Sequence, residues 1–565
     1  MIVAAVRRAP VLLWSVVLAL LVGWPWLRDG LVLAYDMVWV PRWDLTRPDL
    51  WGLGSALPRA VPSDAVAAVV SSLVGSTVAQ RVALFGGLLL AATGGARLVP
   101  RASTAARLAA ATLAVWNPYV AERLAIGQWP MVLAYGALLW LTAELRSGRP
   151  RLHVVTLAVV GTALTPASGV MGAVVVLVLL ARRGAGRLLL ATALVTMANA
   201  PWWVASLLGS SLPPDPAGVE LFALRGQGLL GHLGAALSLG GIWNGEVVDA
   251  TRGAFPAVLL VVGVWVVAVV GLVARRGSLG PLGVLAATGL VIACAGWLAP
   301  GAMERLVEAC GPAALLRDGA RFLALAAPLL VVGFGRGIDV ALGHARRHGL
   351  AAVPIVVGLL LPVAALPGLV SGVGGRLEPV TYPASWDEAR TVVAASDVPG
   401  DLLVLPFAAY RAPEWNGSRP VLDPAGRFFP RPTVVDDRLL VDGTIVRGED
   451  PRAAQVRVAL SSDDPPRALA DLGIGLVVLD TTAPEADEAR TLVVGLERLG
   501  GSDLVVLQVP EVAVDRETAL PARVLVGAGW SCFTLLLLVG VGGTVRDVGR
   551  AMRSSGTRAR ADESP

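Results

Sequence analysis

Aspartate side chains that could act as bases gather in one polar stretch near the start of the chain. Residues 28–79 contain Asp29, Asp36, Asp44, Asp49 and Asp64, and this stretch follows the first long apolar run directly. Carboxylates at a membrane surface can act as general bases or hold a divalent cation. The simpler alternative is a solvated loop whose charges are paired with arginine. The clustering of aspartates immediately after an apolar run favours a chemical role.

A second polar stretch, "NPYVAERLAIGQW" at 117–129, separates two apolar runs. Pro118 ends the preceding helix, since proline breaks a helix and restricts the residue before it. The chain then turns at the outer surface, which puts Glu122 and Arg123 at the level of the lipid headgroups. An arginine there suits a lipid phosphate. Alternatively, Glu122 and Arg123 pair with each other and cap a helical hairpin.

A third polar stretch, "LLRDGARFLAL" at 315–325, stands at the outer start of another apolar run. It holds Arg317, Asp318 and Arg321. Ionisable residues at the mouth of a membrane bundle are costly and often functional, although arginine also serves as an interfacial anchor. If the three stretches converge, they form an external cavity with acid groups and phosphate-binding arginines beside lipid.

The elements that must position these stretches are long apolar segments. The chain has 565 residues, of which 55% are hydrophobic and only 16% charged, whereas soluble proteins carry nearer a quarter. Many apolar runs are close to the roughly 20 residues that cross a bilayer. We expect a polytopic α-helical membrane protein with about twelve spans. Their predicted positions are 10–27, 80–97, 105–120, 129–145, 152–166, 168–181, 187–208, 256–273, 280–298, 319–335, 350–371 and 522–543.

Arginine clusters between these runs predict the orientation. The basic residues are all arginine, and they lie in short clusters rather than in a stripe interleaved with aromatics, which argues against nucleic-acid binding. Short cytoplasmic loops carry an excess of arginine, so both termini are expected in the cytoplasm and residues 28–79, 209–255 and 373–521 outside. The clusters on the cytoplasmic face are Arg7/Arg8, Arg97/Arg101/Arg107, Arg146/Arg149/Arg151, Arg182/Arg183/Arg187, Arg275/Arg276, Arg336/Arg346/Arg347 and those of the tail.

Residues 373–521 change character and predict a small extracytoplasmic α/β domain. "DLLVLPFAAY" and "IGLVVLDTTAP" are strand-like, while "SWDEARTVVAAS" and "DPPRALADLG" have the pattern of capped helices. Trp386, Trp415 and Tyr410 could stack on sugar rings or form the core of this domain. The domains are therefore a membrane part at 1–372, the α/β domain at 373–521, a final transmembrane helix at 522–545 and a basic cytoplasmic tail at 546–565.

Metal and redox sites are not indicated. The three cysteines, Cys294, Cys310 and Cys532, and the four scattered histidines have no metal-binding or redox spacing. The sequence does not imply a particular cofactor, but the aspartates of the first polar stretch could hold a divalent cation.

The three polar stretches resemble a known family. The aspartate-bearing first loop, the "NPYVAERLAIGQW" hairpin and the "LLRDGARF" helix start are similar to the polytopic membrane glycosyltransferases of the GT-C type. The nearest resemblance is to the membrane part of actinobacterial arabinofuranosyltransferases, which are cell-envelope proteins. The hairpin is the most specific element. The resemblance covers residues 1–375 and, more loosely, the rest of the chain.

The resemblance implies transfer of a sugar from a polyprenyl-phosphate donor to a cell-envelope glycan on the outer face. A carboxylate of the first loop would deprotonate the acceptor hydroxyl, and guanidinium groups would stabilise the leaving phosphate. Asp36 is the first choice for the base and Asp44 the second. Both are kept, because "AYDMVW" is not a clean paired-acid motif and does not decide which aspartate acts. The substrate-binding candidates are Glu122, Arg123, Gln128, Arg317 and Arg321, with Arg123 and Arg321 on the phosphate.

Two alternatives remain at this point: a non-catalytic membrane scaffold, which includes an inactive relative, and a transporter of lipid-linked glycans. A transporter should place ionisable residues at mid-membrane. Here the predicted spans are nearly free of charge and the polar groups gather at the outer mouth, which favours chemistry at the surface.

Overall fold

The computed structural model describes residues 2–181, 183–274, 280–513 and 519–562. The predicted cytoplasmic arginines Arg182, Arg275 and Arg276 lie outside these ranges, as do residues 514–518 and 563–565 of the predicted outer domain and tail.

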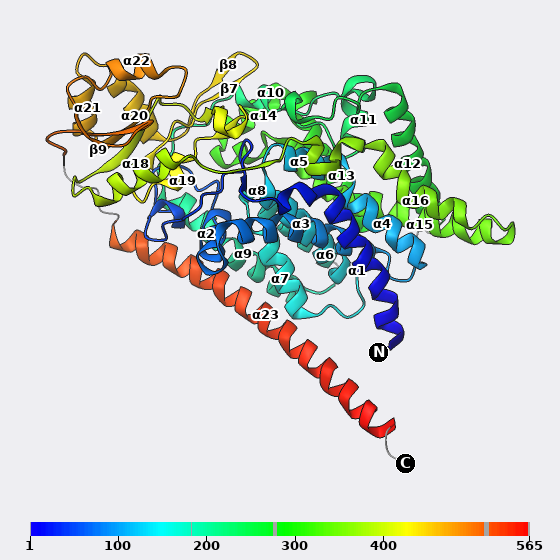
Figure 1. Cartoon of the computed structure of the whole chain (residues 1–565). Coiled ribbons are helices and arrows are strands. Elements are labelled where there is room, and N and C mark those ends of the chain that lie inside the picture. The colour runs from blue at the N-terminus through cyan, green and yellow to red at the C-terminus, as the bar shows by residue number, and fades with distance from the viewer. Residues whose placement is uncertain (1, 182, 275–279, 514–518, 563–565) are drawn as a thin grey trace.

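Most of the chain folds into a bundle of apolar helices (Figure 1). Within the described residues, six helices are long and apolar enough to cross a membrane, and up to eight if two bent pairs each count as one span. The six are α1 (Ile2–Gly23), α3 (Ser76–Leu98), α9 (Ala185–Leu208), α12 (Phe255–Val273), α13 (Gly280–Leu298) and α23 (Leu520–Asp562). The bent pairs are η7 (Gly319–Leu325) with α15 (Ala327–Arg347), and α16 (Ala352–Ala365) with residues 367–374.

Several shorter apolar helices complete the bundle. They are α2 (Ser63–Val74), α4 (Thr104–Val115), α6 (Trp129–Leu145), α7 (Leu152–Thr162), α8 (Pro166–Leu180) and α11 (Gly231–Leu237). The predicted spans 187–208, 256–273 and 280–298 correspond to α9, α12 and α13. The predicted spans between 105 and 181 correspond to α4, α6, α7 and α8, which have 12, 17, 11 and 15 residues. The count of about twelve spans stays a prediction.

Small residues let neighbouring helices approach closely. A Cβ atom added to Gly271 on α12 would lie 2.0 Å from the backbone oxygen of Gly333 on α15, and one added to Gly337 would lie 1.9 Å from that of Val267. Glycine at such crossings brings the two backbones together and increases van der Waals contact, which is the main attraction between helices in a lipid environment.

A five-stranded sheet lies beside the bundle in the order β10-β11-β9-β3-β6. The strands are β3 (Asp401–Leu405), β6 (Thr433–Val434), β9 (Ile474–Asp480), β10 (Glu497–Gly500) and β11 (Leu504–Gln508). β3 runs parallel to β6 and β9, whereas β9, β11 and β10 pair antiparallel. β3 and β9 are the two strands that the sequence predicts.

Helices cover both faces of this sheet. Alternate residues of a strand point to opposite faces, so Leu402 and Val404 pack with α18 (Ala384–Ala395) in the large core that continues into the bundle. Leu403 and Leu405 pack on the other face with α20 (Pro451–Leu460), α21 (Pro465–Asp471) and α22 (Ala486–Thr491). Figure 1 shows these three helices at one end of the molecule, away from the bundle, while α23 runs along it and packs on α9 and α7.

Short elements connect the sheet region to the bundle. β1 (Leu31–Val32) pairs with β2 (Pro379–Val380), β4 (Tyr410–Arg411) with β5 (Val421–Leu422), and β7 (Leu439–Val441) with β8 (Thr444–Val446). The other short helices are α5 (Pro118–Ala125), α10 (Gly218–Leu221), α14 (Pro300–Ala309), α17 (Val370–Gly374) and α19 (Ala425–Phe428). The β1–β2 pair ties the first polar stretch to the segment that leads into the sheet.

Candidate functional site

Asp36 lies in a tight turn that packs against the loop between α5 and α6. The turn closes with paired backbone hydrogen bonds between Ala34 and Met37, at 3.2 and 2.8 Å. The backbone N–H of Asp36 donates to the carbonyl of Ile126 at 3.1 Å. Gly127 (φ +81°) makes this approach possible, because a Cβ atom there would lie 2.2 Å from both the Ala34 oxygen and the Met37 nitrogen.

Both carboxylate oxygens of Asp36 accept hydrogen bonds from side chains that are remote in sequence. Gln128 Nε2 donates to Oδ2 at 3.0 Å, and the hydroxyl of Tyr410 donates to Oδ1 at 2.5 Å. Gln128 comes from the start of α6, and Tyr410 comes from β4 beside the sheet. Asp36 itself is only half-buried. Its orientation is therefore fixed from two sides, and the residue is not fully enclosed.

A chain of polar contacts continues from Gln128 to Arg321. Arg123 Nη1 donates to Gln128 Oε1 at 2.9 Å and to Asp318 Oδ2 at 3.1 Å. Arg321 Nε lies 2.8 Å from the same Asp318 oxygen. The side chains of Arg123 and Asp318 are 1% and 6% exposed, whereas that of Arg321 is 31% exposed. Arg123 is therefore a buried residue that links Gln128 to Asp318, and Arg321 is the arginine of this network that reaches the surface.

The charged groups in this series of contacts stabilise one another. Burial alone would raise the pKa of Asp318, but the guanidinium groups of Arg123 and Arg321 hold that pKa below its ordinary value. Asp318 therefore remains ionised and fixes both arginines. Within the described residues, the terminal nitrogens of Arg321 donate to no protein group, so they remain able to bind an anion.

A second arginine reaches the Asp36 region from the sheet side. Arg427 Nε donates to Asp64 Oδ2 at 2.7 Å. Burial and the charge of Asp36 raise the pKa of Tyr410 well above its ordinary value, while Arg427 and Arg321 lie close enough to oppose that shift. Guanidinium groups therefore approach the Asp36 region from two sides, with Arg427 paired to Asp64 and Arg321 paired to Asp318.

Local sequence explains why α5 presents Arg123 to this site. Asn117 is the N-cap of α5: its Oδ1 accepts the backbone N–H of Val120 at 3.2 Å, while its Nδ2 donates to the carbonyl of Leu113 at 2.9 Å. Asn117 thus satisfies the end of α4 and the start of α5 together, and Pro118 occupies the first helical position, where it is favoured. The resulting bend between α4 and α5 leaves Arg123 within reach of Gln128 and Asp318.

The structure does not bring three of the sequence candidates into this network. Asp44 Oδ1 accepts the N–H and hydroxyl of Thr46 at 2.9 and 2.7 Å, within its own loop. Arg317 pairs with Glu449 at 2.6 Å.

Glu122 also points away from Asp36. It accepts from Gln227 Nε2 at 2.7 Å and from the backbone N–H of Ile242 at 3.1 Å, so it anchors the 209–255 segment to α5. Burial raises its pKa above the ordinary value against the opposing charge of Arg252.

The aromatic residues of the sheet region divide between core and site. Trp386 is 4% exposed and packs against Tyr382, Trp415 and Phe428 with ring centroids 5.0–5.9 Å apart. Trp386 therefore belongs to the core of this region. Tyr410 instead reaches Asp36.

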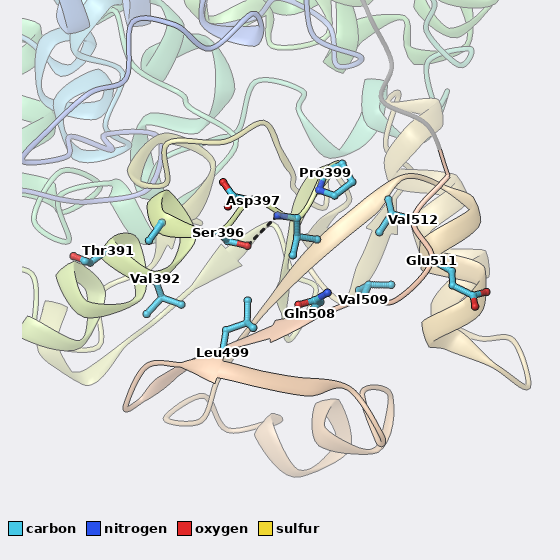
Figure 2. A pocket seen from close by; sticks show the side chains of 12 residues that line it. Thr391, Val392, Ser396, Asp397, Pro399, Leu499, Gln508, Val509, Glu511 and Val512 are labelled. Atoms are coloured by element: carbon cyan, nitrogen blue, oxygen red, sulfur yellow. Dashed lines mark hydrogen bonds between the residues drawn. The ribbon is translucent and has the colours of Figure 1, made fainter.

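A cleft of about 750 Å³ opens between α18, the turn at 396–399 and strands β10 and β11. Figure 2 shows Ser396, Asp397, Gln508 and Glu511 along its wall. Its lining residues carry no aromatic ring and no basic group, and we assign it no catalytic role.

The residues around Asp36 do not form a set of ligands for a divalent cation. Within the described part of the chain, no group of three or more His, Cys, Asp or Glu side chains is arranged so that it could hold a metal ion. Both Asp36 oxygens already accept hydrogen bonds from Gln128 and Tyr410.

Asp318, Tyr410 and Arg427 were absent from the catalytic and substrate-binding candidates, and the sequence offered Tyr410 only as an aromatic that could stack on sugar rings or form the core. Asp318 had a signal, since it lies in the third polar stretch between two candidate arginines. Arg427 had none, because its partner Asp64 is 363 residues away.

Sequence comparisons find no relatives: no protein-family model matches the chain, and no curated protein does. Comparison of structures finds arabinofuranosyltransferase AftD from mycobacteria, with a TM-score of 0.58 and 18% sequence identity. The chain has a GT-C-like fold. A structure of a mutant of the same mycobacterial protein matches with a TM-score of 0.57. These matches cover 90% of this chain but only 40% and 42% of the mycobacterial chains.

The fold similarity confirms the resemblance that the three polar stretches predict. The protein is a multi-pass, mostly helical membrane protein with a small sheet region. At this level of identity the comparison concerns the fold alone, and the chemistry has to be argued from the residues of this chain.

Proposed function

We propose that this protein is a membrane glycosyltransferase that moves a sugar from a polyprenyl-phosphate donor to a cell-envelope glycan on the outer face. The observation that carries the proposal is the continuous chain of contacts from Asp36 through Gln128, Arg123 and Asp318 to Arg321. It joins a half-buried carboxylate to an arginine whose side chain is 31% exposed, on a GT-C-like fold.

Asp36 is the proposed general base. The acceptor hydroxyl gives its proton to the carboxylate while its oxygen attacks the anomeric carbon. The bond from that carbon to the phosphate oxygen breaks, and polyprenyl phosphate leaves with the electron pair. A one-step displacement of this kind inverts the anomeric centre. Gln128 and Tyr410 hold the carboxylate for this step, which depends on alignment of the reacting atoms.

Arg321 is the proposed contact for the phosphate. Negative charge grows on the leaving phosphate as the glycosidic bond breaks, and a guanidinium group stabilises such charge through charge-assisted hydrogen bonds. Asp318 occupies one side of Arg321 and leaves its terminal nitrogens for the ligand. Arg123 is held between Gln128 and Asp318 and acts on the phosphate only through Arg321.

The proposed orientation has both termini in the cytoplasm, residues 373–521 outside and about twelve crossings. α6 supports it, because Gln128 precedes its first turn whereas Glu144 lies in its last. Glu144 binds Arg97 at 2.7 Å and Arg151 at 3.1 Å. The 17 residues of α6 span about 25 Å. The arginine cluster and the Asp36 site therefore lie at opposite ends of the same helix, and the arginine-rich end is the one expected in the cytoplasm.

Transfer by the full chain in liposomes tests the proposal. The first donor is a polyprenyl-phosphate arabinofuranose, since the structural neighbour is an arabinofuranosyltransferase, with an oligosaccharide from an envelope glycan as acceptor. We expect radiolabelled sugar to move from the lipid phase to the acceptor. A panel of other polyprenyl-phosphate sugars follows if arabinofuranose is not used. Absence of transfer from every donor, in protein that remains folded, would contradict the proposal and favour a scaffold.

A further inference from the structure

We propose that the sheet region completes the catalytic site: Tyr410 is a positioning residue that holds the Asp36 carboxylate in its reactive orientation. This inference rests on the proposed transferase function. It means that the active site is built from two parts of the chain, because Asp36 and Tyr410 are 374 residues apart.

The contact between Tyr410 and Asp36 is part of a built interface. The backbone N–H of Tyr35 donates to the carbonyl of Pro420 at 2.6 Å, and that of Leu422 donates to the carbonyl of Tyr35 at 2.9 Å. Leu422 on β5 is in turn the register partner of Tyr410 on β4. The turn that carries Asp36 is therefore attached to the strand pair that carries Tyr410.

The Tyr410 hydroxyl can act only as a donor to Asp36 over the working pH range. Its pKa is raised well above the ordinary value by burial and by the adjacent carboxylate, so the proton stays on the phenol. A hydrogen bond to the ionised form of a carboxylate stabilises that form. Gln128 does the same at the other oxygen, so the carboxylate cannot rotate without breaking one of two bonds.

Other charged groups also face this carboxylate and remain in place when Tyr410 is changed. Arg427 and its partner Asp64 approach from the sheet side and from α2. Arg321 approaches from η7, while Arg123 and Asp318 act through Gln128. Removing the phenol hydroxyl therefore removes one hydrogen bond and leaves the surrounding charged groups in place.

The experiment measures kcat and KM for sugar transfer by wild type and by Tyr410→Phe, together with the thermal midpoint of each protein. A group that only holds the reacting carboxylate in place affects the aligned transition state more than it affects substrate binding. We therefore expect Tyr410→Phe to lower kcat roughly tenfold, as for loss of one hydrogen bond to a charged group, and to leave both KM values close to those of wild type.

Tyr382→Phe is the matched control. Tyr382 is also a buried tyrosine of the sheet region that donates to the first polar stretch, but its acceptor is the carbonyl of Trp39, at 2.9 Å. We expect Tyr382→Phe to lower the thermal midpoint and to leave kcat at the wild-type value. A wild-type kcat for Tyr410→Phe, or an equal loss of kcat in Tyr382→Phe, would overturn the inference.

Failure of the wider proposal looks different. If wild type transfers sugar and Asp36→Asn does not, while Tyr410→Phe keeps the wild-type kcat, the function stands and the role of Tyr410 is refuted. If Asp36→Asn transfers as well as wild type, the base assignment itself is wrong and Tyr410 has no base to position.

Discussion

Gly127→Ala is the substitution that most sharply tests the geometry around Asp36. The added methyl group would lie 2.2 Å from the Ala34 oxygen and from the Met37 nitrogen. Both are backbone atoms of the turn that carries Asp36, so no flexible side chain can move aside. To reach ordinary van der Waals contact, the turn and the α5–α6 loop must separate by about 1 Å.

The effect on rate follows from that displacement. Asp36 is held to the loop by its own N–H and by Gln128, and a shift of about 1 Å in a reacting group can lower the rate roughly 100-fold. The left-handed backbone of residue 127 adds about 1–2 kcal/mol of strain for alanine. We therefore expect kcat/KM for sugar transfer to fall about 100-fold, together with a lower thermal midpoint.

Gly349→Ala separates the two contributions. Gly349 has a similar φ of +71°, and a Cβ atom there has no neighbour within 4 Å. It should lose stability through backbone strain alone and keep wild-type kcat/KM. The assay is transfer of labelled sugar in liposomes, with thermal unfolding of each variant in detergent. If Gly127→Ala retains wild-type kcat/KM, or loses no more of it than Gly349→Ala, the close fit of turn and loop does not matter for activity.

Two further predictions concern the charged groups Arg321 and Glu449. Arg321→Ala should raise KM for the polyprenyl-phosphate donor roughly 10- to 100-fold, as expected for a lost charge-assisted hydrogen bond. Arg317→Ala should leave that KM unchanged. Equal effects of the two substitutions would refute the assignment of the phosphate to Arg321. Burial alone would raise the pKa of Glu449, but the charges of Arg59 and Arg317 outweigh burial and lower that pKa below its ordinary value. Ionised Glu449 therefore adds to the free energy of unfolding above about pH 5, and this contribution is lost as pH falls through the lowered pKa. The thermal midpoint of wild type should accordingly exceed that of Glu449→Gln at neutral pH and converge on it at acid pH, while a pH-independent difference would contradict this account.

The sequence predicts the parts of the fold that depend on local pattern. Long apolar runs identify α9, α12 and α13, and short runs rich in Val and Leu identify β3 and β9, because periodicity and length carry that information. The strand pair β4–β5 has two residues in each strand, which is too short for any periodic signal. Its position depends on the turn at Asp36, more than 370 residues earlier in the chain.

Within the site, the sequence predicts which residues take part better than it predicts the direction in which their side chains point. The sequence groups Glu122 with Arg123 as neighbours, but successive residues of a helix point about 100° apart. Arg123 accordingly reaches Asp318 while Glu122 reaches Gln227. In the same way, Arg317 turns to Glu449 and Arg321 to Asp318. Side-chain direction depends on how the helices pack, and the spacing of residues along the sequence does not predict it.

The central claim is that Asp36 is the base of a sugar transfer. The most direct measurement compares transfer by Asp36→Asn and Asp44→Asn in liposomes, with thermal midpoints measured for both variants. Asparagine keeps the shape of the side chain and can still accept from Tyr410, so we expect Asp36→Asn to fold and to lose transfer. Asp44 serves its own loop through Thr46, and Asp44→Asn should transfer at the wild-type rate. Retained transfer by folded Asp36→Asn would contradict the claim.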